Sequence, residues 1–92
     1  MFIKGKSAMV TGGASGLGSA TVRKLHSLGA QVLIADLNQK AGKALKVELG
    51  ERALFIETDV TRETSVTRAV EGAVNQHGGL HILVNCAGIA IA

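Results

Sequence analysis

The sequence is poor in several residue types, and each scarcity narrows what the chain can be. Its 92 residues contain no proline, tyrosine or tryptophan, one cysteine and two phenylalanines. A single cysteine, Cys86, excludes an internal disulfide framework and fits a reducing compartment. Two aromatic side chains provide no platform for stacking bases, so we expect no nucleic-acid partner.

Long apolar runs are also missing, and the charge balance is mild. No run approaches the length of a membrane span, and the N-terminus is too short and polar for a signal peptide, so we expect a cytoplasmic chain with no membrane partner. The net charge of +3 comes from scattered lysines and arginines, which favour solvated helix faces. Apolar residues make up 47% of the chain, enough for the core of one domain.

Twelve glycines, by contrast, separate short apolar runs from longer periodic ones. The runs predict strands at residues 7–10, 31–35, 53–57 and 81–84. A helix is expected from Gly16 to residue 28, a second after Asn38 as N-cap, and a third after Thr61 as N-cap. The expected inward faces are Leu17, Ala20, Thr21, Leu25 and Leu28 in the first helix, Ala41, Ala44, Leu45 and Leu49 in the second, and Val66, Ala69, Val70, Ala73 and Val74 in the third.

The order β-α-β-α-β-α-β predicts an α/β chain of Rossmann type, in which a parallel sheet lies between two helical layers. Right-handed crossovers give the strand order 3-2-1-4, so the switch point falls between the first and fourth strands. Ligands bind at the carboxyl ends of strands at such a point. The glycine-rich stretch after the first strand and residues 85–88 after the fourth would border the same crevice.

The glycine-rich stretch reads Thr11-Gly12-x-x-x-Gly16-x-Gly18. Gly12 permits a tight turn, Gly16 lets the backbone approach a ligand, and Gly18 allows the helix to pack closely on the sheet. The helix that begins here offers free N–H groups and a partial positive charge to a pyrophosphate, and Ser15 can add a hydroxyl. The context indicates dinucleotide binding; the alternative is a flexible turn without a ligand.

Asp36 ends the second strand, 24 residues beyond Gly12. A carboxylate there can accept hydrogen bonds from the adenosine ribose and repel a 2′-phosphate by on the order of 4 kcal/mol per unit charge at about 4 Å, before screening. Neither Ser15 nor Leu37 supplies a compensating cation, so the residues favour NAD over NADP. Alternatively, Asp36 only helps to cap the next helix.

The remaining candidates are less specific. Asp59 either accepts a hydrogen bond from an adenine amino group, with Val60 beside the ring, or only supports the start of the third helix. Cys86 is interpreted as a small residue at a strand end, because no histidine partner for a nucleophile is evident. The three histidines, at positions 26, 77 and 81, predict no metal site, because no cysteine or carboxylate cluster accompanies them.

Taken together, four motifs resemble the short-chain dehydrogenase/reductase family over nearly the whole chain. They are Thr11-Gly12-Gly-Ala-Ser-Gly16-Leu-Gly18, Asp36, Asp59-Val60 and Asn85-Cys86-Ala87-Gly88. Most members of this family have a second asparagine at the position of Cys86. The cysteine makes this stretch most similar to the 3-hydroxyacyl-CoA dehydrogenase branch of the family. The resemblance implies a homo-oligomer, a tetramer, that acts on a small molecule.

The resemblance also implies a role for each matched residue. Ser15 and Leu17 would contact the cofactor at the turn, Asp36 would hold the ribose, and Asp59 with Val60 the adenine. Cys86, Ala87 and Gly88 would line the adenosine side of the crevice, and Asn85 would brace the sheet.

The family's catalytic serine, Tyr-x-x-x-Lys pair and asparagine have no counterpart here, because the sequence contains no tyrosine. The predicted last strand is apolar and would form an open edge of the sheet, which also favours a chain that is part of a longer protein. We therefore expect residues 1–92 to be the amino-terminal part of one NAD(P)-binding Rossmann domain, inactive alone, from an enzyme that oxidises a secondary alcohol. A 3-hydroxyacyl-CoA is the expected substrate, and a 3-oxoacyl carrier protein or a steroid alcohol is the alternative. A non-catalytic adenine-nucleotide module, or a structural piece pairing through the fourth strand, remains open.

Overall fold

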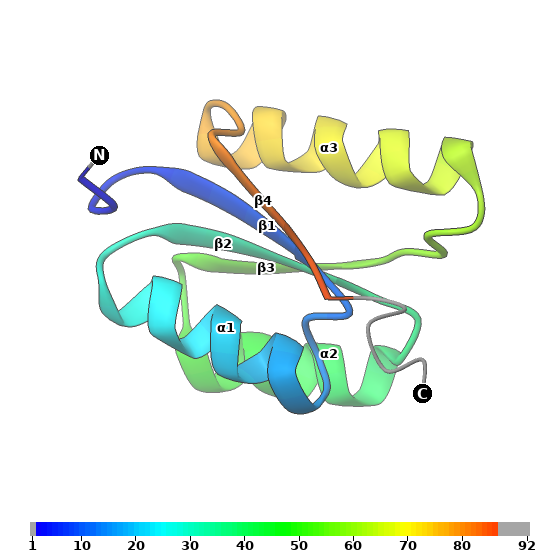
Figure 1. Ribbon diagram of the computed structural model, residues 1–92, viewed down its shortest axis with the longest axis horizontal. Helices are drawn as coiled ribbons and strands as arrows, with labels where there is room; N and C mark the ends of the chain where they lie inside the picture. The colour runs from blue at the N-terminus through cyan, green and yellow to red at the C-terminus, as the bar shows by residue number, and fades with distance from the viewer. Residues whose placement is uncertain (1, 87–92) are drawn as a thin grey trace.

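Alternating apolar runs and amphipathic segments fold into a parallel sheet between two helical layers (Figure 1). The computed structural model describes residues 2–86. The elements in chain order are β1 (Ser7–Thr11), α1 (Gly16–Ser27), β2 (Gln31–Asp36), α2 (Gln39–Leu49), β3 (Ala53–Glu57), α3 (Glu63–His77) and β4 (Ile82–Asn85). The predicted element order is confirmed, and the bounds of all four strands agree with the predicted ones to within one residue.

The sheet has the order β3-β2-β1-β4, and every neighbouring pair is parallel. Helices α1 and α2 cover one face and α3 covers the other, as right-handed crossovers require (Figure 1). The predicted topology and switch point are therefore confirmed. In the register, Thr11 lies opposite Ala35 on one side and Asn85 on the other. The carboxyl ends of β1, β2 and β4 thus meet at one edge of the sheet.

Two apolar clusters fill the space between the layers. Val10, Val22 and Ile34 belong to the cluster beneath α1 and α2, and Met9 and Leu33 belong to the one beneath α3. β1 is buried along its whole length, whereas β4 alternates between half-buried and exposed residues. Because β1 and β2 are covered on both faces, their apolar runs are continuous rather than alternating.

The predicted inward face of α1 is confirmed only in part, since Leu25 packs against the cluster beneath α1 and α2. The buried residues of this helix are Gly18 and Val22, whereas Leu17 and Leu28 are exposed by 62% and 45%. A Cβ on Gly18 would overlap the carbonyl oxygen of Gly12, so the helix meets the preceding turn at its glycine. The spacing of apolar residues does not predict a buried glycine. The buried face of α1 is therefore rotated relative to the predicted one.

The other two helices follow their predicted faces in part. Leu45 of α2 and both Ala69 and Ala73 of α3 are buried as expected. Ala44 is exposed, and its place against the sheet is taken by Gly42, where a Cβ would overlap the ring of Phe55. Val74 of α3 is 46% exposed.

The two predicted N-caps have different outcomes. The Asn38 side chain accepts a hydrogen bond from the Ala41 N–H at 3.0 Å, so Asn38 caps α2 as predicted. Thr61 as the cap of α3 is wrong: the N-cap residue is Arg62, whose side chain makes no capping bond. The Thr61 hydroxyl instead donates to Asp59, which lies nearer than the first turn of the helix.

Candidate functional site

The glycine turn between β1 and α1 has a backbone that residues with side chains rarely adopt. Gly12 and Gly16 have φ values of 69° and 39°. A Cβ on Gly16 would meet nothing within 4 Å, so this part of the backbone faces open space. Gly18 packs closely against the turn itself, at Gly12, whereas the sequence predicted that it packs on the sheet. Such a turn can bring a ligand against bare backbone.

Helix α1 begins at this turn with open N–H groups. Ser15 is the N-cap residue but its side chain makes no capping bond, and the first bond back along the helix runs from the Ser19 N–H to the Ser15 carbonyl. Within residues 2–86, the N–H groups of Gly16, Leu17 and Gly18 have no backbone acceptor. The first turn also contains no acidic residue. The start of α1 is therefore suited to an anion.

Asp36 connects the end of β2 with the glycine turn. Its Oδ2 accepts a hydrogen bond from the Ala14 N–H at 3.0 Å, and its Oδ1 accepts one from the Asn38 N–H at 2.8 Å. The carboxylate therefore braces the turn and the entry to α2 together. Each carboxylate oxygen can accept a second hydrogen bond, so the group still has capacity for ligand hydroxyls.

A cleft of about 100 Å³ opens where these elements meet. Its lining comes from the ends of three neighbouring strands and consists of Gly12, Ala35, Asp36, Leu37, Thr58 and Val60. Sequence reasoning found Gly12, Asp36 and Val60 but missed Leu37 and Thr58. Leu37 is 60% exposed, and an apolar residue directly after a strand-ending aspartate was the available signal. Thr58 gave no signal, because only the fold carries it to the cleft.

Asp59 lies just beyond the cleft, and its carboxylate holds the loop before α3. Oδ1 accepts hydrogen bonds from the Thr61 hydroxyl at 2.6 Å and from the Thr61 N–H at 2.9 Å. These two bonds, with a smaller contribution from the charge of Arg62, lower the pKa of Asp59. Support of the helix start, one of the two predicted roles, is thus visible, and Oδ2 keeps acceptor capacity for a ligand.

The end of β4 is tied to β1 at the switch point. The Thr11 hydroxyl donates to the Asn85 side-chain oxygen at 2.6 Å, and the Cys86 N–H donates to the Thr11 carbonyl at 3.0 Å. The bond to Thr11 matches the bracing role expected of Asn85. Cys86 is half-buried and packs against the cluster beneath α1 and α2. Ala87 and Gly88, also predicted at this site, lie outside the described residues.

The histidines have structural surroundings. His81 Nδ1 accepts a hydrogen bond from the Ser7 N–H at 3.0 Å. Burial and the charge of Arg52 lower the pKa of His26, and burial and the charge of Lys46 lower that of His77. In the part of the chain that the structure describes, no three histidine, cysteine or acidic side chains are grouped to hold a metal ion. No helix among residues 2–86 has the length and apolarity to cross a membrane.

Comparison with known proteins places this geometry in context. The model of the short chain dehydrogenase family matches residues 6–92. The 3-hydroxyacyl-CoA dehydrogenase type-2 of Drosophila melanogaster is 46% identical over 90 residues, which are 98% of this chain and 35% of that protein. The chain therefore spans about a third of the length of this relative.

Two solved structures have the same fold over a similar share of their length. The 3-hydroxyacyl-CoA dehydrogenase type-2 of Mycobacterium avium is 56% identical, with a TM-score of 0.86 over 91% of this chain and 33% of that one. The 3-ketoacyl-(acyl-carrier-protein) reductase of Brucella melitensis, solved with NADH, is 33% identical, with a TM-score of 0.85 over 88% of this chain and 34% of that one.

Proposed function

This chain belongs to the short-chain dehydrogenase family, and we propose that it forms the NAD-binding half of a dehydrogenase. One observation carries the proposal: Asp36 lines the same cleft as Gly12 while its Oδ2 accepts a hydrogen bond from the glycine turn. A ribose acceptor and a pyrophosphate cradle are thereby held in one rigid arrangement. Preorganised groups lose little freedom on binding, which favours affinity.

Each part of the dinucleotide has a candidate partner in this chain. Pyrophosphate binds the open N–H groups at the start of α1, where Leu17 is exposed and Ser15 offers its hydroxyl. Asp36 accepts hydrogen bonds from the adenosine ribose. The adenine occupies the cleft beside Val60 and donates from its amino group to Asp59. Cys86, Ala87 and Gly88 border the adenosine from the β4 side. When bound, the nicotinamide accepts or gives up a hydride.

The same residues favour NAD over NADP. A 2′-phosphate on the adenosine ribose would lie against the Asp36 carboxylate, and both oxygens of that carboxylate are already fixed by backbone N–H groups. The side chain therefore cannot swing away without releasing the glycine turn. Neither Ser15 nor Leu37, the flanking residues, offers a positive charge to the phosphate.

Calorimetric titration of the chain with NAD and NADP tests the cofactor proposal. We expect NAD to bind at least about tenfold more tightly than NADP, because an unpaired repulsion beside a partly exposed carboxylate exceeds about 1.4 kcal/mol. In the D36A variant, NAD affinity should fall and the two affinities should converge. Equal affinities in the unmodified chain would contradict the role assigned to Asp36.

The E57Q variant provides a matched control for this titration. Glu57 ends β3 as Asp36 ends β2, and the two are register partners, but Glu57 does not line the cleft. Its Oε1 accepts a hydrogen bond from the Gln39 side chain at 2.8 Å, which a glutamine can also accept. We therefore expect E57Q to keep the NAD preference of the unmodified chain.

For the whole enzyme, we propose oxidation of a secondary alcohol by hydride transfer to NAD, with a 3-hydroxyacyl-CoA as the substrate. The similarity to the two type-2 dehydrogenases supports this substrate, and the similarity to the Brucella reductase supports an acyl carrier protein thioester as the alternative. Because the family's acid/base group is a tyrosine and this sequence has none, residues 1–92 alone should give no turnover with NAD and 3-hydroxybutyryl-CoA. NADH formation above background, followed at 340 nm, would contradict this.

A second candidate role, pairing through β4, has its own supporting observation. β4 is the last strand of the sheet, and its Leu83 is 61% exposed. An open strand with an exposed apolar side chain can pair with another chain. Light scattering tests this role: a concentration-dependent increase in mass that an L83K substitution removes would support it, and a monomer at every concentration would contradict it.

A further inference from the structure

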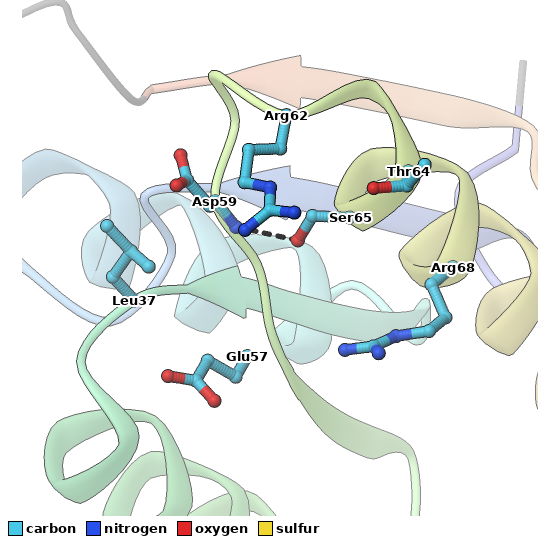
Figure 2. Close-up of a pocket in the computed structure, with 7 residues that line it drawn as sticks. All are labelled: Leu37, Glu57, Asp59, Arg62, Thr64, Ser65 and Arg68. Carbon is cyan, nitrogen blue, oxygen red and sulfur yellow. Dashed lines mark hydrogen bonds between the residues drawn. The ribbon is translucent and has the colours of Figure 1, made fainter.

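A second and larger hollow lies beside the cleft that contains Gly12 and Asp36 rather than within it. It has a volume of about 370 Å³ and opens between the end of β3 and the first two turns of α3 (Figure 2). Its lining residues are Leu37, Glu57, Asp59, Arg62, Thr64, Ser65 and Arg68. Only Leu37 also borders the smaller cleft, so the two spaces adjoin without sharing their polar groups.

Opposite charges lie on opposite sides of this hollow. Figure 2 shows the carboxylates of Glu57 and Asp59 on the Leu37 side, whereas Arg62 and Arg68 reach in from the α3 side. Both carboxylates have partners of their own: Glu57 accepts a hydrogen bond from Gln39, and Asp59 accepts two from Thr61. Hydrogen bonds from these neutral donors leave both carboxylates negatively charged, so the charges of the lining balance as a whole and only the α3 side of the hollow is cationic.

Arg62 and Arg68 form no close ion pair with a described acidic residue, although the charge of Arg62 contributes to lowering the pKa of Asp59. Among residues 2–86 the one ion pair joins Arg23 to Glu48, on α1 and α2, and neither Arg62 nor Arg68 has a carboxylate oxygen within 4.0 Å. Two guanidinium groups with unused N–H donors therefore face the same space.

Two hydroxyl groups complete the donor set on the α3 side. Ser65 Oγ accepts a hydrogen bond from the Asp59 N–H at 2.8 Å, so its own O–H remains available to donate into the hollow (Figure 2). Thr64 places a second hydroxyl at the rim. Guanidinium forks and hydroxyls are the side-chain donors that match the oxygens of a phosphoryl group.

We propose that the α3 side of this hollow is a phosphoryl-binding subsite formed by Arg62, Arg68, Ser65 and Thr64. It is separate from the pyrophosphate cradle at the glycine turn, and Asp59, the proposed partner of the adenine, lines the opposite side of the same hollow. Because both arginines are exposed and Glu57 and Asp59 repel an anion from the opposite side, binding is weak and falls as added salt screens the charges. Its ligand is either free inorganic phosphate or the phosphate of an ester such as a second nucleotide.

Nuclear magnetic resonance of the chain, saturated with NAD so that the glycine turn is filled, tests the subsite. Titration with inorganic phosphate, against sodium chloride of equal ionic strength, should shift the side-chain Nε–H signals of Arg62 and Arg68 and the amide of Ser65. A parallel titration with AMP separates the two sources: tighter binding of AMP identifies a phosphate ester, and equal binding identifies the free anion.

Two charge-matched variants make the test specific. R62Q/R68Q should weaken phosphate binding about tenfold, because two exposed charge pairs are lost. K24Q/K43Q removes the same charge from exposed positions outside the hollow and should change the affinity less than twofold. No shift at Arg62 and Arg68, or equal weakening in both variants, would overturn the proposal. Failure of NAD to move the signals of the glycine turn would contradict the proposed function instead, leaving the phosphate result readable.

Discussion

The turns after β1 and β3 lie at the same edge of the sheet and offer opposite kinds of surface. The β1–α1 turn presents bare backbone, with Gly16 facing open space and no acidic residue in the first turn of α1. The β3–α3 turn presents side chains, among them Asp59 and Arg62. The first turn offers N–H groups fixed by the backbone, and an added Cβ has space at Gly16 but not at Gly18. The second offers charged side chains, of which Asp59 also holds the loop before α3.

The largest expected effect is an added methyl group behind the glycine turn. G18A places a Cβ where the Gly12 carbonyl lies, so we expect a loss of about 1–3 kcal/mol in the free energy of unfolding. Urea unfolding followed by circular dichroism measures it. S19A, one position along the same helix, adds no atom and should lose less than about 1 kcal/mol. If G18A were as stable as S19A, close contact would not hold the turn.

A smaller effect is expected from weakening the brace behind the turn. D36N removes one of the two carboxylate oxygens that accept the Ala14 and Asn38 N–H groups, so we expect a loss of about 1 kcal/mol and faster amide exchange at Ala14. Hydrogen exchange resolved by residue measures both sites. E57Q, at the register partner, should leave Ala14 unchanged. Unchanged exchange in D36N would show that the turn holds its shape without the carboxylate.

The smallest effect concerns the second turn. The Thr61 hydroxyl and N–H lower the pKa of Asp59, so the charged form contributes stability above the ordinary aspartate range, and this stability is lost as pH falls through the lowered pKa. T61V removes the hydroxyl donor and should raise the pKa toward its ordinary value. Carbon-detected titration of the Asp59 carboxyl measures it. T64V, which keeps both bonds to Asp59, should leave the pKa unchanged.

Sequence reasoning predicted the elements that depend on local chemistry. The apolar runs, the glycines between them and the Asn38 cap all act within a few residues, and all have the expected outcome. It failed where the identity of a packing or hydrogen-bonding partner decides. The rotation of α1 depends on the Gly18 contact with Gly12, and the choice of Thr61 as a cap overlooked Asp59, which takes its hydroxyl two residues earlier.

The candidate site divides in the same way. Gly12, Gly16 and Asp36 were found from their positions after strands, because a parallel sheet carries strand ends to one edge. Thr58 could not be assigned to the cleft, since only the packing of three strand ends brings it there, whereas Leu37 had a signal in its position directly after Asp36. The hollow beside the cleft depends on the directions in which its side chains point, and the periodicity of apolar residues does not determine those directions.

The sequence by itself determined the strand-helix alternation, the order β3-β2-β1-β4 and the place of the glycine turn, because apolar period, turn residues and crossover handedness are local or general rules. The tertiary structure alone decided that Asp36 braces Ala14 across 22 residues. It also turned Arg62 and Arg68 toward one hollow. The bond between Asp36 and Ala14 and the lining of the hollow each bring together residues from different elements, and they exist only once the sheet has set the distance between them.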